Sequence, residues 1–521
     1  MSAGAGLAEC AEPEATRIES QKVVMRLREL FAGVEVGRTS GPADADIRSI
    51  VYDSRKVEAG SLFFALRGEK LNGLDFVEQA VRKGAVAIAS ESARLAGLPE
   101  TTAWFELPSN TDRRALARVA ANFYGHPADA LKLIGVTGTN GKTTTTFLVD
   151  SILRAAGFSS GLIGTIGYRT PAGERPALNT TPESLDLEQM FAEIRDAGGT
   201  HAAIETSSHA LAMRRLTGCH FAVAIFTNLT RDHLDYHKTF EAYFAAKRLL
   251  FEGTGAGAPD AGVINIDDPY GAQLQGLAQK SLTYGLKNSA DLTAKKFSLG
   301  FNGLEFTAQT PAGKIEVCSP LVGRINVYNI LAAIGAGIAL NIPNQKIEEG
   351  VANLPLVPGR FERVDEGQPF LVIVDYAHTD DALRNLISTA REIRAGARII
   401  TLFGAGGERD RTKRPLMGEA AGSLSDLVVL TSDNPRSEDP LRIINDVMVG
   451  LQKTNANYRS EPDREKALEI AIDEARPGDI VLLAGKGHET YQVLRDSSIA
   501  FDDREKARAI LQRKGFAKRK L

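Results

Sequence analysis

The chain has 521 residues, 43% of them hydrophobic and 24% charged, and a formal net charge of −3. This length corresponds to about three domains, and the composition is typical of an ordinary soluble globular protein. A nearly balanced charge gives no support for non-specific binding to nucleic acid. No apolar run reaches the roughly eighteen residues of a membrane span. We therefore expect small-molecule partners, and neither nucleic acid nor a membrane.

Cysteine usage and the N-terminus suggest the compartment. Cys10, Cys219 and Cys318 are far apart and match no metal or disulfide spacing, which favours a reducing environment. Residues 1–20 are rich in Ala, Glu and Gly and lack the basic-then-apolar pattern of a signal peptide. We expect a flexible N-terminal extension on a monomeric, cytoplasmic protein.

The first region, residues 21–129, has short strand-like runs at 61–66 and 85–89. A helical pattern follows at 112–124, and the Gly-His-Pro sequence at 125–127 ends it. We expect a small α/β domain that ends near residue 129.

The second region, residues 130–357, opens on a phosphate-binding pattern. An apolar run from residue 133 ends in a glycine-rich turn, after which Lys142 and Thr143 begin an amphipathic helical segment. Backbone N–H groups at a helix N-terminus bind oxyanions, a lysine adds a point charge, and a threonine hydroxyl can hold Mg²⁺. The usual pattern has glycine six residues before the lysine, where this chain has Val136, with Gly135 and Gly138 on either side.

Strands alternate with helical stretches as far as residue 353, as in a wound parallel sheet. Residues 354–359 form a predicted linker. The alternation then restarts with apolar runs at 370–374, 398–403, 427–430 and 479–483, and a helical pattern follows each of the first three. We therefore predict an α/β protein of three domains. A central parallel-sheet domain with the phosphate loop is flanked by an N-terminal α/β domain and a Rossmann-like C-terminal domain (358–521).

Polar clusters follow six of the predicted strands, at 205–209, 228–233, 375–378, 404–411, 432–436 and 485–489. In open parallel sheets, ligands bind outside the carboxyl ends of the strands, so these positions favour binding sites. Near a phosphate loop, Glu205 and His233 can hold a second Mg²⁺ beside the one at Thr143. Each of them alone is also compatible with an ordinary hydrogen-bonded polar group.

Several cations allow two interpretations. Lys247 lies in an apolar helical stretch at 243–251, where it either extends to solvent or is a buried amine able to take up CO₂ as a metal-binding carbamate. Arg436 follows Asp-Asn-Pro in a turn and suits bidentate binding of a carboxylate. Four cations after a glycine turn suit a carboxylate or phosphate better than a solvated helix face: Arg409, Arg411, Lys413 and Arg414.

Taken together, these residues resemble the Mur ligase family, from about residue 23 to the C-terminus. The phosphate loop is similar to that of the family, including the displaced glycine. Within the family, Asn-Thr-Thr-Pro at 179–182, Ser-Ser-His-Ala-Leu at 207–211 and Asp-Asn-Pro-Arg at 433–436 resemble the MurE type. The resemblance implies an ATP-dependent ligase of peptidoglycan precursor synthesis. Such enzymes join a diamino acid to the γ-carboxylate of UDP-MurNAc-L-Ala-D-Glu through an acyl phosphate.

The resemblance also implies a role for each matching residue. For the ATP site it implies Gly138, Thr139, Asn140, Gly141, Lys142, Thr143, Thr144, Asn329, Arg360 and Asp375. For UDP-MurNAc and its dipeptide it implies Tyr52, Asp53, Ser54, Asn179, Thr180, Thr181, Ser207 and Arg215. For the diamino acid it implies Arg409, Asp433, Asn434, Pro435, Arg436, Gly485 and Glu489. It implies Lys142, Lys247, Glu205 and His233 as catalytic residues, and Thr143, Glu205, His233 and carbamylated Lys247 as ligands of two Mg²⁺.

The third substrate is predicted from charge. meso-2,6-Diaminopimelate carries a distal carboxylate and ammonium, whereas L-lysine carries a bare terminal ammonium. Arg436 would attract that carboxylate and repel the ammonium of lysine, and Glu489 could pair with the distal ammonium of diaminopimelate. A buried unmatched charge costs several kcal/mol, so we expect diaminopimelate.

Three alternatives are weaker. The first is an L-lysine-adding ligase of the same type. The second is a ligase similar to folylpolyglutamate synthase, which would give no reason for a uridine-binding first domain. The third is a P-loop ATPase or GTPase switch, which would need a Walker-B acid that only Glu205 resembles. Within the MurE pattern one departure is visible, because Met213 stands where glutamine is common.

Overall fold

The computed structural model describes residues 24–68, 71–301 and 303–517. The predicted N-terminal extension and Cys10 lie outside the described residues. The chain divides into two compact units, residues 1–115 and 116–521. In the described part, no helix has both the length and the apolar character needed to cross a membrane.

The first unit contains a five-stranded sheet in the order β2-β7-β6-β5-β4. Both predicted strands are confirmed, as β5 (Ser61–Phe64) and β6 (Ala85–Ser90), which pair in parallel. Trp104, Phe63 and Ile88 lie in its core and are at most 1% exposed. The other elements are β1 (Met25–Arg26), α1 (Leu27–Leu30), β2 (Arg38–Ser40), β3 (Asp46–Ile47), β4 (Ser49–Val51), α2 (Val77–Arg82) and β7 (Ala103–Glu106). Helix α3 (Asp112–Tyr124) has the predicted bounds and continues into the second unit.

The second unit opens on an eight-stranded sheet in the order β11-β10-β9-β12-β8-β13-β14-β15. The six strands from β9 to β15 run parallel, and β10 and β11 add an antiparallel edge. The central strands are almost wholly buried, as their continuous apolar runs predict. The strands are β8 (Lys132–Thr137), β9 (Ser160–Ile163), β10 (Gly167–Thr170), β11 (Gly173–Pro176), β12 (His201–Glu205), β13 (Phe221–Phe226), β14 (Ala261–Asn265) and β15 (Lys280–Tyr284).

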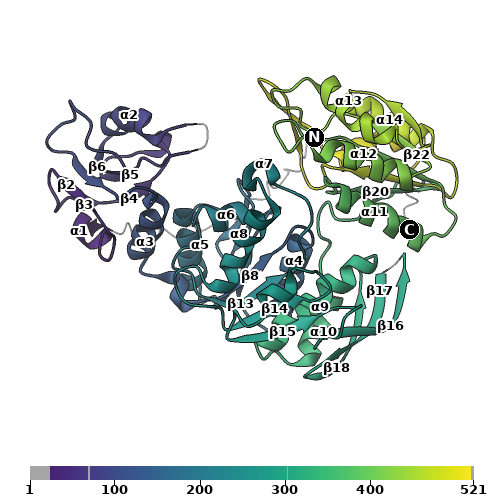
Figure 1. Ribbon diagram of the computed structural model, residues 1–521, viewed down its shortest axis with the longest axis horizontal. Helices are drawn as coiled ribbons and strands as arrows, with labels where there is room; N and C mark the ends of the chain where they lie inside the picture. Colours follow the sequence, from purple (N-terminus) through teal and green to yellow (C-terminus); the bar gives the residue numbers. More distant parts are fainter. Residues whose placement is uncertain (1–23, 69–70, 302, 518–521) are drawn as a thin grey trace, which may run out of the picture. The chain divides into compact units, whose positions relative to one another are not determined.

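Helices cover both faces of this sheet (Figure 1). One face packs against α4 (Lys142–Ala155) and α9 (Arg324–Ala339), and α10 (Asn344–Ala352) packs on α4. The other packs against α5 (Ser184–Asp196) and α8 (Phe240–Glu252), and the short helices α6 (Ser208–Ala212) and α7 (Leu234–His237) precede α8. Leu148 and Ile152 on α4 are at most 1% exposed, so the predicted apolar face of that helix is the buried one.

The prediction of alternating strands and helices is wrong for residues 293–319. This segment folds as an antiparallel sheet of β16 (Thr293–Gly300), β17 (Gly303–Thr310) and β18 (Gly313–Ser319). Leu304, Phe306 and Ala308 alternate with more exposed residues, which is the period of a half-buried strand. The turns are short because Gly303 and Gly313 adopt positive φ angles of 137° and 102°.

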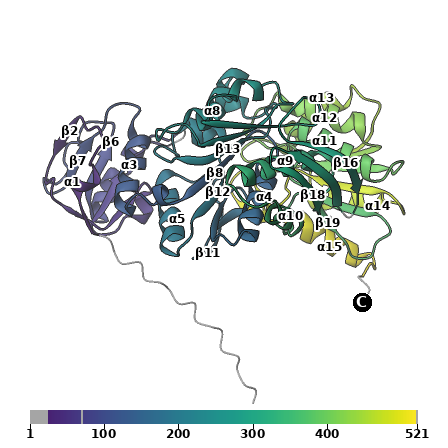
Figure 2. The ribbon, with the colours of Figure 1, turned by 90° about the horizontal axis from the view of Figure 1, so that it is seen from below.

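The C-terminal part of the second unit has a six-stranded sheet in the order β19-β20-β24-β21-β22-β23. All four predicted strands are confirmed, as β20 (Leu371–Asp375), β21 (Ile399–Phe403), β22 (Leu427–Leu430) and β24 (Ile480–Ala484). The predicted helices α11 (Asp380–Ile393), α12 (Lys413–Leu424) and α13 (Pro440–Leu451) pack on one face, and α14 (Arg464–Asp473) and α15 (Asp503–Arg513) on the other (Figure 2). The remaining strands are β19 (Glu362–Val364), β23 (Asn457–Ser460), β25 (Tyr491–Val493) and β26 (Ser498–Ala500).

Candidate functional site

The predicted strand, phosphate loop and helix are present, and the geometry explains the displaced glycine. Val136 is a fully buried residue of β8, so the loop begins only after Thr137. Gly138 has a φ of 145°, and a Cβ there would lie 1.8 Å from Thr227 Oγ1. Gly141 has a φ of 88°, and a Cβ would lie 2.4 Å from Asn329 Oδ1. Only glycine fits both positions, because the backbone is left-handed and the neighbouring atoms leave no room.

Two lysines meet at one carbonyl of this loop. Lys142 Nζ donates to the carbonyl oxygens of Gly138 (3.1 Å) and Thr139 (2.8 Å), and Lys247 Nζ donates to the same Gly138 oxygen (2.6 Å). Burial lowers the pKa of Lys142 from its ordinary value. The two amines therefore lie where a phosphate chain bound by the loop would pass.

Lys247 does not extend to solvent. It projects from α8, is 1% exposed, and its Nζ lies 4.5 Å from the centre of the Tyr243 ring. Burial holds the pKa of Lys247 well below its ordinary value, and the nearby Lys142 ammonium adds to this effect. A neutral buried amine has a free electron pair, which is the form that reacts with CO₂.

Glu205 ends β12, as predicted, and its carboxylate connects the phosphate loop to its surroundings. Its Oε2 accepts from Thr143 Oγ1 (3.1 Å) and Thr165 Oγ1 (3.0 Å), and its Oε1 accepts from the backbone N–H of Thr165 (2.8 Å). His233 has a left-handed backbone with a φ of 54°, and burial lowers the pKa of its imidazole to about 3. A neutral imidazole can act as a metal ligand.

The donors around the loop fit Mg²⁺ in kind. Thr143 and Glu205 offer oxygen atoms, His233 offers a neutral nitrogen, and a carbamate on Lys247 would add two more oxygens. Among the described residues no cluster of three or more His, Cys, Asp or Glu side chains could hold a metal ion. Mg²⁺ usually keeps several waters and binds through one or two carboxylates together with substrate phosphates, and Glu205 supplies one carboxylate beside the loop.

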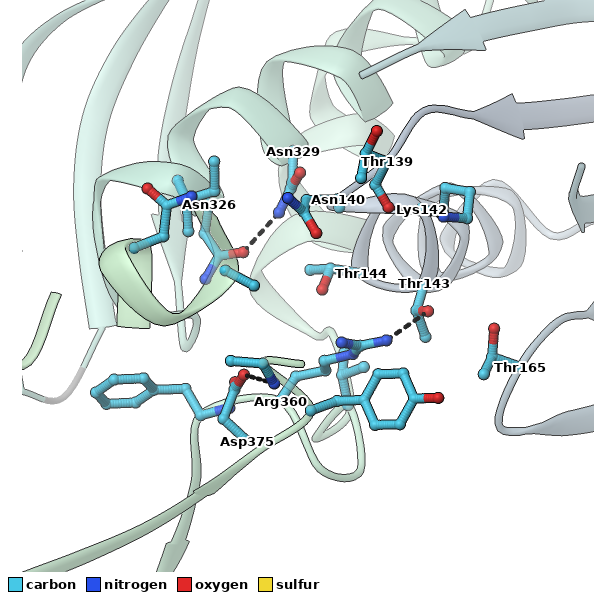
Figure 3. Close-up of a pocket in the computed structure, with 18 of the residues that line it drawn as sticks. Thr139, Asn140, Lys142, Thr143, Thr144, Thr165, Asn326, Asn329, Arg360 and Asp375 are labelled. Atoms are coloured by element: carbon cyan, nitrogen blue, oxygen red, sulfur yellow. Dashed lines mark hydrogen bonds between the residues drawn. The ribbon is translucent and has the colours of Figure 1, made fainter. Parts of the chain in front are cut away.

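Except for Gly138, the residues predicted to bind ATP line one cavity of about 380 Å³, part of which is drawn in Figure 3. Arg360 Nη2 donates to Thr143 Oγ1 (3.0 Å), and its guanidinium lies 4.8 Å from the centre of the Tyr376 ring. Asn329 Nδ2 donates to Asn326 Oδ1 (2.8 Å). The predicted residues that line the cavity are Thr139, Asn140, Gly141, Lys142, Thr143, Thr144, Thr180, Glu205, Ser207, His233, Lys247, Asn329, Arg360 and Asp375.

A second cavity of about 300 Å³ brings together most of the predicted diamino acid residues. Arg436 Nη1 donates to the Gly407 carbonyl (2.6 Å), and burial together with the nearby Arg409 lowers the pKa of Arg436. Pro435 is not part of the lining. The predicted residues that line this cavity are Asn179, Thr180, His233, Arg409, Asp433, Asn434, Arg436, Gly485 and Glu489.

The dipeptide residues Thr181, Ser207 and Arg215 are linked by hydrogen bonds. Thr181 Oγ1 donates to Ser207 Oγ (3.2 Å), and Arg215 Nη1 donates to the Thr181 carbonyl (2.9 Å). Met213 contributes its sulfur atom, which lies 3.5 Å from Arg215 Nη2. Glu183, which is 6% exposed, lies 3.4 Å from Arg215 Nε and holds the other side of that guanidinium.

The four cations at 409–414 do not form one anion site. Arg409 lines the second cavity, whereas Arg411 is mostly exposed and pairs with Asp446. Lys413 lies 3.4 Å from Asp232, and Arg414 is buried between Glu438 and Asp446. Lys413 also lines the second cavity, so the interpretation of the cluster as one site is wrong for Arg411 and Arg414.

The residues predicted to bind uridine lie in the first unit. Ser54 is buried and its hydroxyl donates to Gln79 Oε1 (2.8 Å), while Asp53 accepts from the backbone and side chain of Arg55. The cavity of about 260 Å³ in this unit is lined by other residues, among them Arg67, Asn72 and Glu91. The uridine roles of Tyr52 and Ser54 stay predictions.

Sequence reasoning missed several residues that contact the predicted ones. Thr165 binds Glu205, and Asp232 lies 3.4 Å from both His233 and Lys413. Lys486 pairs with Glu489 and Asp433. Asp232 and Lys486 belong to the polar clusters at 228–233 and 485–489. Their positions after predicted strands could therefore have identified them as candidate site residues. Thr165 carries no comparable sequence signal.

Comparisons with known proteins match most of the chain. Three family models match: "Mur ligase family, catalytic domain" at residues 46–124, "Mur ligase middle domain" at 136–337, and "Mur ligase, glutamate ligase domain" at 359–487. The UDP-N-acetylmuramoyl-L-alanyl-D-glutamate–2,6-diaminopimelate ligase of Solibacter usitatus is 52% identical over 94% of this chain and 99% of its own length.

Two solved structures are also similar. A structure of a UDP-N-acetylmuramoyl-L-alanyl-D-glutamate–2,6-diaminopimelate ligase is 34% identical, with a TM-score of 0.63, over 94% of this chain and 99% of that chain. The MurF ligase of Thermotoga maritima, solved in complex with ADP, is 18% identical with a TM-score of 0.61, over 89% of this chain and 97% of that chain. The second likeness concerns the fold alone.

Proposed function

The chain belongs to the Mur ligase family, and from this premise we propose that it is the ATP-dependent ligase that joins meso-2,6-diaminopimelate to UDP-MurNAc-L-Ala-D-Glu. Three relatives at 52%, 46% and 44% identity are named as UDP-N-acetylmuramoyl-L-alanyl-D-glutamate–2,6-diaminopimelate ligases, and they are matched over 98–99% of their length. The first-domain match at 46–124 disfavours both a folylpolyglutamate synthase and a P-loop switch.

One observation carries the proposal: the phosphate-loop cavity and the diamino acid cavity share a wall. The residues that line both are Thr165, Thr180, Asp232, His233, Tyr376 and His378. A ligand in the first cavity and a ligand in the second would therefore meet at this wall. Ligation through an acyl phosphate requires this arrangement, because the phosphorylated carboxylate must be reached by the incoming amine.

In the first step, the γ-carboxylate of the D-Glu residue attacks the γ-phosphorus of ATP, and ADP leaves as the acyl phosphate forms. Lys142 would neutralise charge on the transferring group, and the backbone N–H groups after Gly141 would hold the phosphates. Arg360, already bound to the Thr143 hydroxyl, adds a second cation beside the loop.

In the second step, the amine of diaminopimelate attacks the acyl carbon. The tetrahedral intermediate collapses with loss of phosphate, and the nitrogen gives up one proton as the amide forms. Arg409 and Arg436 would hold carboxylates of the diamino acid, and Asp433 and Glu489 its distal ammonium. The half-buried residues of the shared wall would limit the access of water to the acyl phosphate.

We further propose that two Mg²⁺ bind here, held by Thr143, Glu205, His233 and a carbamate on Lys247. When bound, these ions would neutralise charge on the phosphoryl group being transferred. The carbamate forms when the neutral Lys247 amine adds to the carbon of CO₂ and its nitrogen releases one proton to water. The support for this is the buried amine with its lowered pKa beside the loop.

Membership of the family also supports an assignment of one substrate to each domain. We propose three domains, a uridine-binding domain at 21–129, an ATP-binding domain at 130–357 and a diamino-acid-binding domain at 358–521. The second and third family models fall within the last two of these ranges. A monomeric state and a cytoplasmic location, where ATP and the nucleotide precursor occur together, complete the proposal.

The test is a phosphate-release assay with ATP, UDP-MurNAc-L-Ala-D-Glu and one amino acid at a time. We expect release only when all three substrates are present, and faster release with meso-diaminopimelate than with L-lysine. Faster release with L-lysine would overturn the choice of diamino acid. Release without any amine would overturn the ligase in favour of an ATPase.

A further inference from the structure

Lys486 is a buried lysine next to the diamino acid cavity. It follows β24, and its side chain is 0% exposed. It does not line the cavity, although Gly485 before it and Glu489 after it do. Lys486 is therefore placed to act on the cavity through the residues that face it.

Its ammonium contacts three of those residues. Lys486 Nζ lies 3.0 Å from Glu489 Oε2, 3.3 Å from Asn434 Oδ1 and 3.7 Å from Asp433 Oδ1. Asn434 Nδ2 also donates to Glu489 Oε2, at 2.9 Å. One buried group thus connects the loop after β22 to the loop after β24, and both loops supply residues predicted to hold the diamino acid.

The contact also sets the charge of the cavity. Asp433 Oδ1 is buried and makes no hydrogen bond to the described residues, and the Lys486 ammonium, 3.7 Å away, forms an ion pair with it. The cavity lining carries five carboxylates and three cations: Asp232, Asp235, Asp410, Asp433 and Glu489, and Arg409, Lys413 and Arg436. The Lys486 ammonium behind the wall offsets part of this negative charge, so its removal would make the cavity more negative by one charge.

We propose that Lys486 is a positioning residue that also sets specificity for the diamino acid; this inference rests on the function proposed above. It holds Asp433, Asn434 and Glu489 in place for the distal ammonium of the ligand, and its charge disfavours a ligand with net positive charge. meso-Diaminopimelate is neutral overall at pH 7, whereas L-lysine carries +1. An extra cation behind the wall therefore favours diaminopimelate over lysine.

The variant Lys486→Gln keeps a hydrogen-bonding side chain but removes the charge. We expect its KM for meso-diaminopimelate to rise about tenfold, which corresponds to about 1.4 kcal/mol, while its KM for ATP changes less than about twofold. The ratio of kcat/KM values for diaminopimelate and L-lysine should fall by about the same factor. Lys486→Arg keeps the charge, so its KM for diaminopimelate and its selectivity over L-lysine should both lie close to those of the unaltered protein.

The matched control is Lys506→Met, which removes a lysine from α15 in the same unit. Lys506 pairs with Glu465 and does not line either cavity. The KM values of this variant for meso-diaminopimelate, L-lysine and ATP should therefore stay close to those of the unaltered protein. An unchanged KM for diaminopimelate in folded Lys486→Gln would overturn the proposal. A parallel rise in the KM for ATP would also overturn it, because that result indicates a general loss of structure.

If Lys486→Gln does not fold, the comparison moves to a Glu489→Gln background, where the closest carboxylate has lost its charge. Adding Lys486→Gln to Glu489→Gln should shift selectivity towards L-lysine by about tenfold, and no shift would refute the role of the charge. Turnover of the unaltered protein tests the proposed function separately. If that protein prefers L-lysine, the proposed substrate fails, whereas the KM split between amino acid and ATP still decides the role of Lys486.

Discussion

Replacing Arg436 with alanine tests the diamino acid cavity most directly. The residue has a φ of 53°, its backbone N–H donates to the Val493 carbonyl (3.1 Å), and its guanidinium is partly buried and bound to the Gly407 carbonyl. Alanine is also an L residue, so the backbone strain is unchanged. The substitution therefore removes the guanidinium and leaves the backbone contacts of the turn in place.

The magnitude follows from the hydrogen bonds lost to the substrate carboxylate. Losing a charge-assisted contact in a partly buried site costs about 2–4 kcal/mol, which corresponds to a rise of roughly 30- to 700-fold in the KM for diaminopimelate. The KM for ATP should change little, since Arg436 does not line the phosphate-loop cavity. The ratio of kcat/KM values for diaminopimelate and L-lysine should also fall, because Arg436, the cation that repels the lysine ammonium, has been removed.

The assay is phosphate release at varied diamino acid and at varied ATP. The control is Arg411→Ala, which removes a guanidinium that is 65% exposed, pairs with Asp446 and lies outside the lining of the second cavity. We expect this control to behave like the unaltered protein. An amino acid KM in Arg436→Ala within about twofold of normal would remove Arg436 from the binding site, since it corresponds to less than about 0.5 kcal/mol.

Three further substitutions test the loop and the buried charges. Gly138→Ala places a Cβ 1.8 Å from Thr227 Oγ1 and should lower kcat/KM for ATP about 100-fold, because the loop is displaced. An unchanged kcat/KM for ATP in the phosphate-release assay would show that the loop tolerates a side chain. Arg464→Met leaves the Asp503 carboxylate buried without its ion-pair partner and should lower the free energy of unfolding, measured in urea, by about 3–5 kcal/mol. The double variant Arg464→Met/Asp503→Leu should recover most of this loss. If the double variant recovers none of it, the unpaired carboxylate is not the cause. Burial raises the pKa of Glu188 to about 8, so between about pH 4.5 and 8 the folded protein keeps a proton that the unfolded chain releases. The free energy of unfolding should therefore fall by up to about 5 kcal/mol as the pH rises through this range. Glu188→Gln should flatten that slope in thermal unfolding across the same pH range, and an unchanged slope would exclude Glu188 as its source.

The strands, the helices around them and the phosphate loop could be predicted because each has a strong local cause. Fully buried parallel strands need continuous apolar runs, and the runs at 427–430 and 399–403 leave few other structures open. The loop needs glycine at positive φ, which marks Gly138 and Gly141 in the sequence. The antiparallel strands at 293–319 were missed because their alternation is short and interrupted by a bulge between Lys295 and Ser298.

The candidate site could be predicted only in part, because contacts between distant segments decide it. The sequence places Arg409, Arg411 and Arg414 together, yet only Arg409 lines the cavity, since the other two find acidic partners on or near α13. Those partners, Glu438 and Asp446, lie about thirty residues along the chain. No local pattern connects residues at that separation.

Burial alone does not decide what a buried cation does, and three examples from this chain show that the partner does. Burial lowers the pKa of Lys247, and its neighbour, the Lys142 amine, lowers that pKa further, so the neutral nitrogen can act as a nucleophile. Arg464 forms an ion pair with Asp503, both 0% exposed, and donates to the carbonyls of Ser432 and Ala484, so it fixes the ends of β22 and β24.

Lys486 differs from both, because its ion pairs are with carboxylates that themselves face a ligand cavity. An ammonium engaged by two carboxylates is a poor nucleophile, since protonated nitrogen has no free electron pair. Uptake of CO₂ is therefore expected at Lys247 and not at Lys486, although both are buried lysines beside the same reaction site. Carbon-13 NMR of protein in ¹³C-bicarbonate should show a carbamate signal that Lys247→Met abolishes and Lys486→Arg retains. A signal lost in Lys486→Arg and kept in Lys247→Met would reverse the assignment.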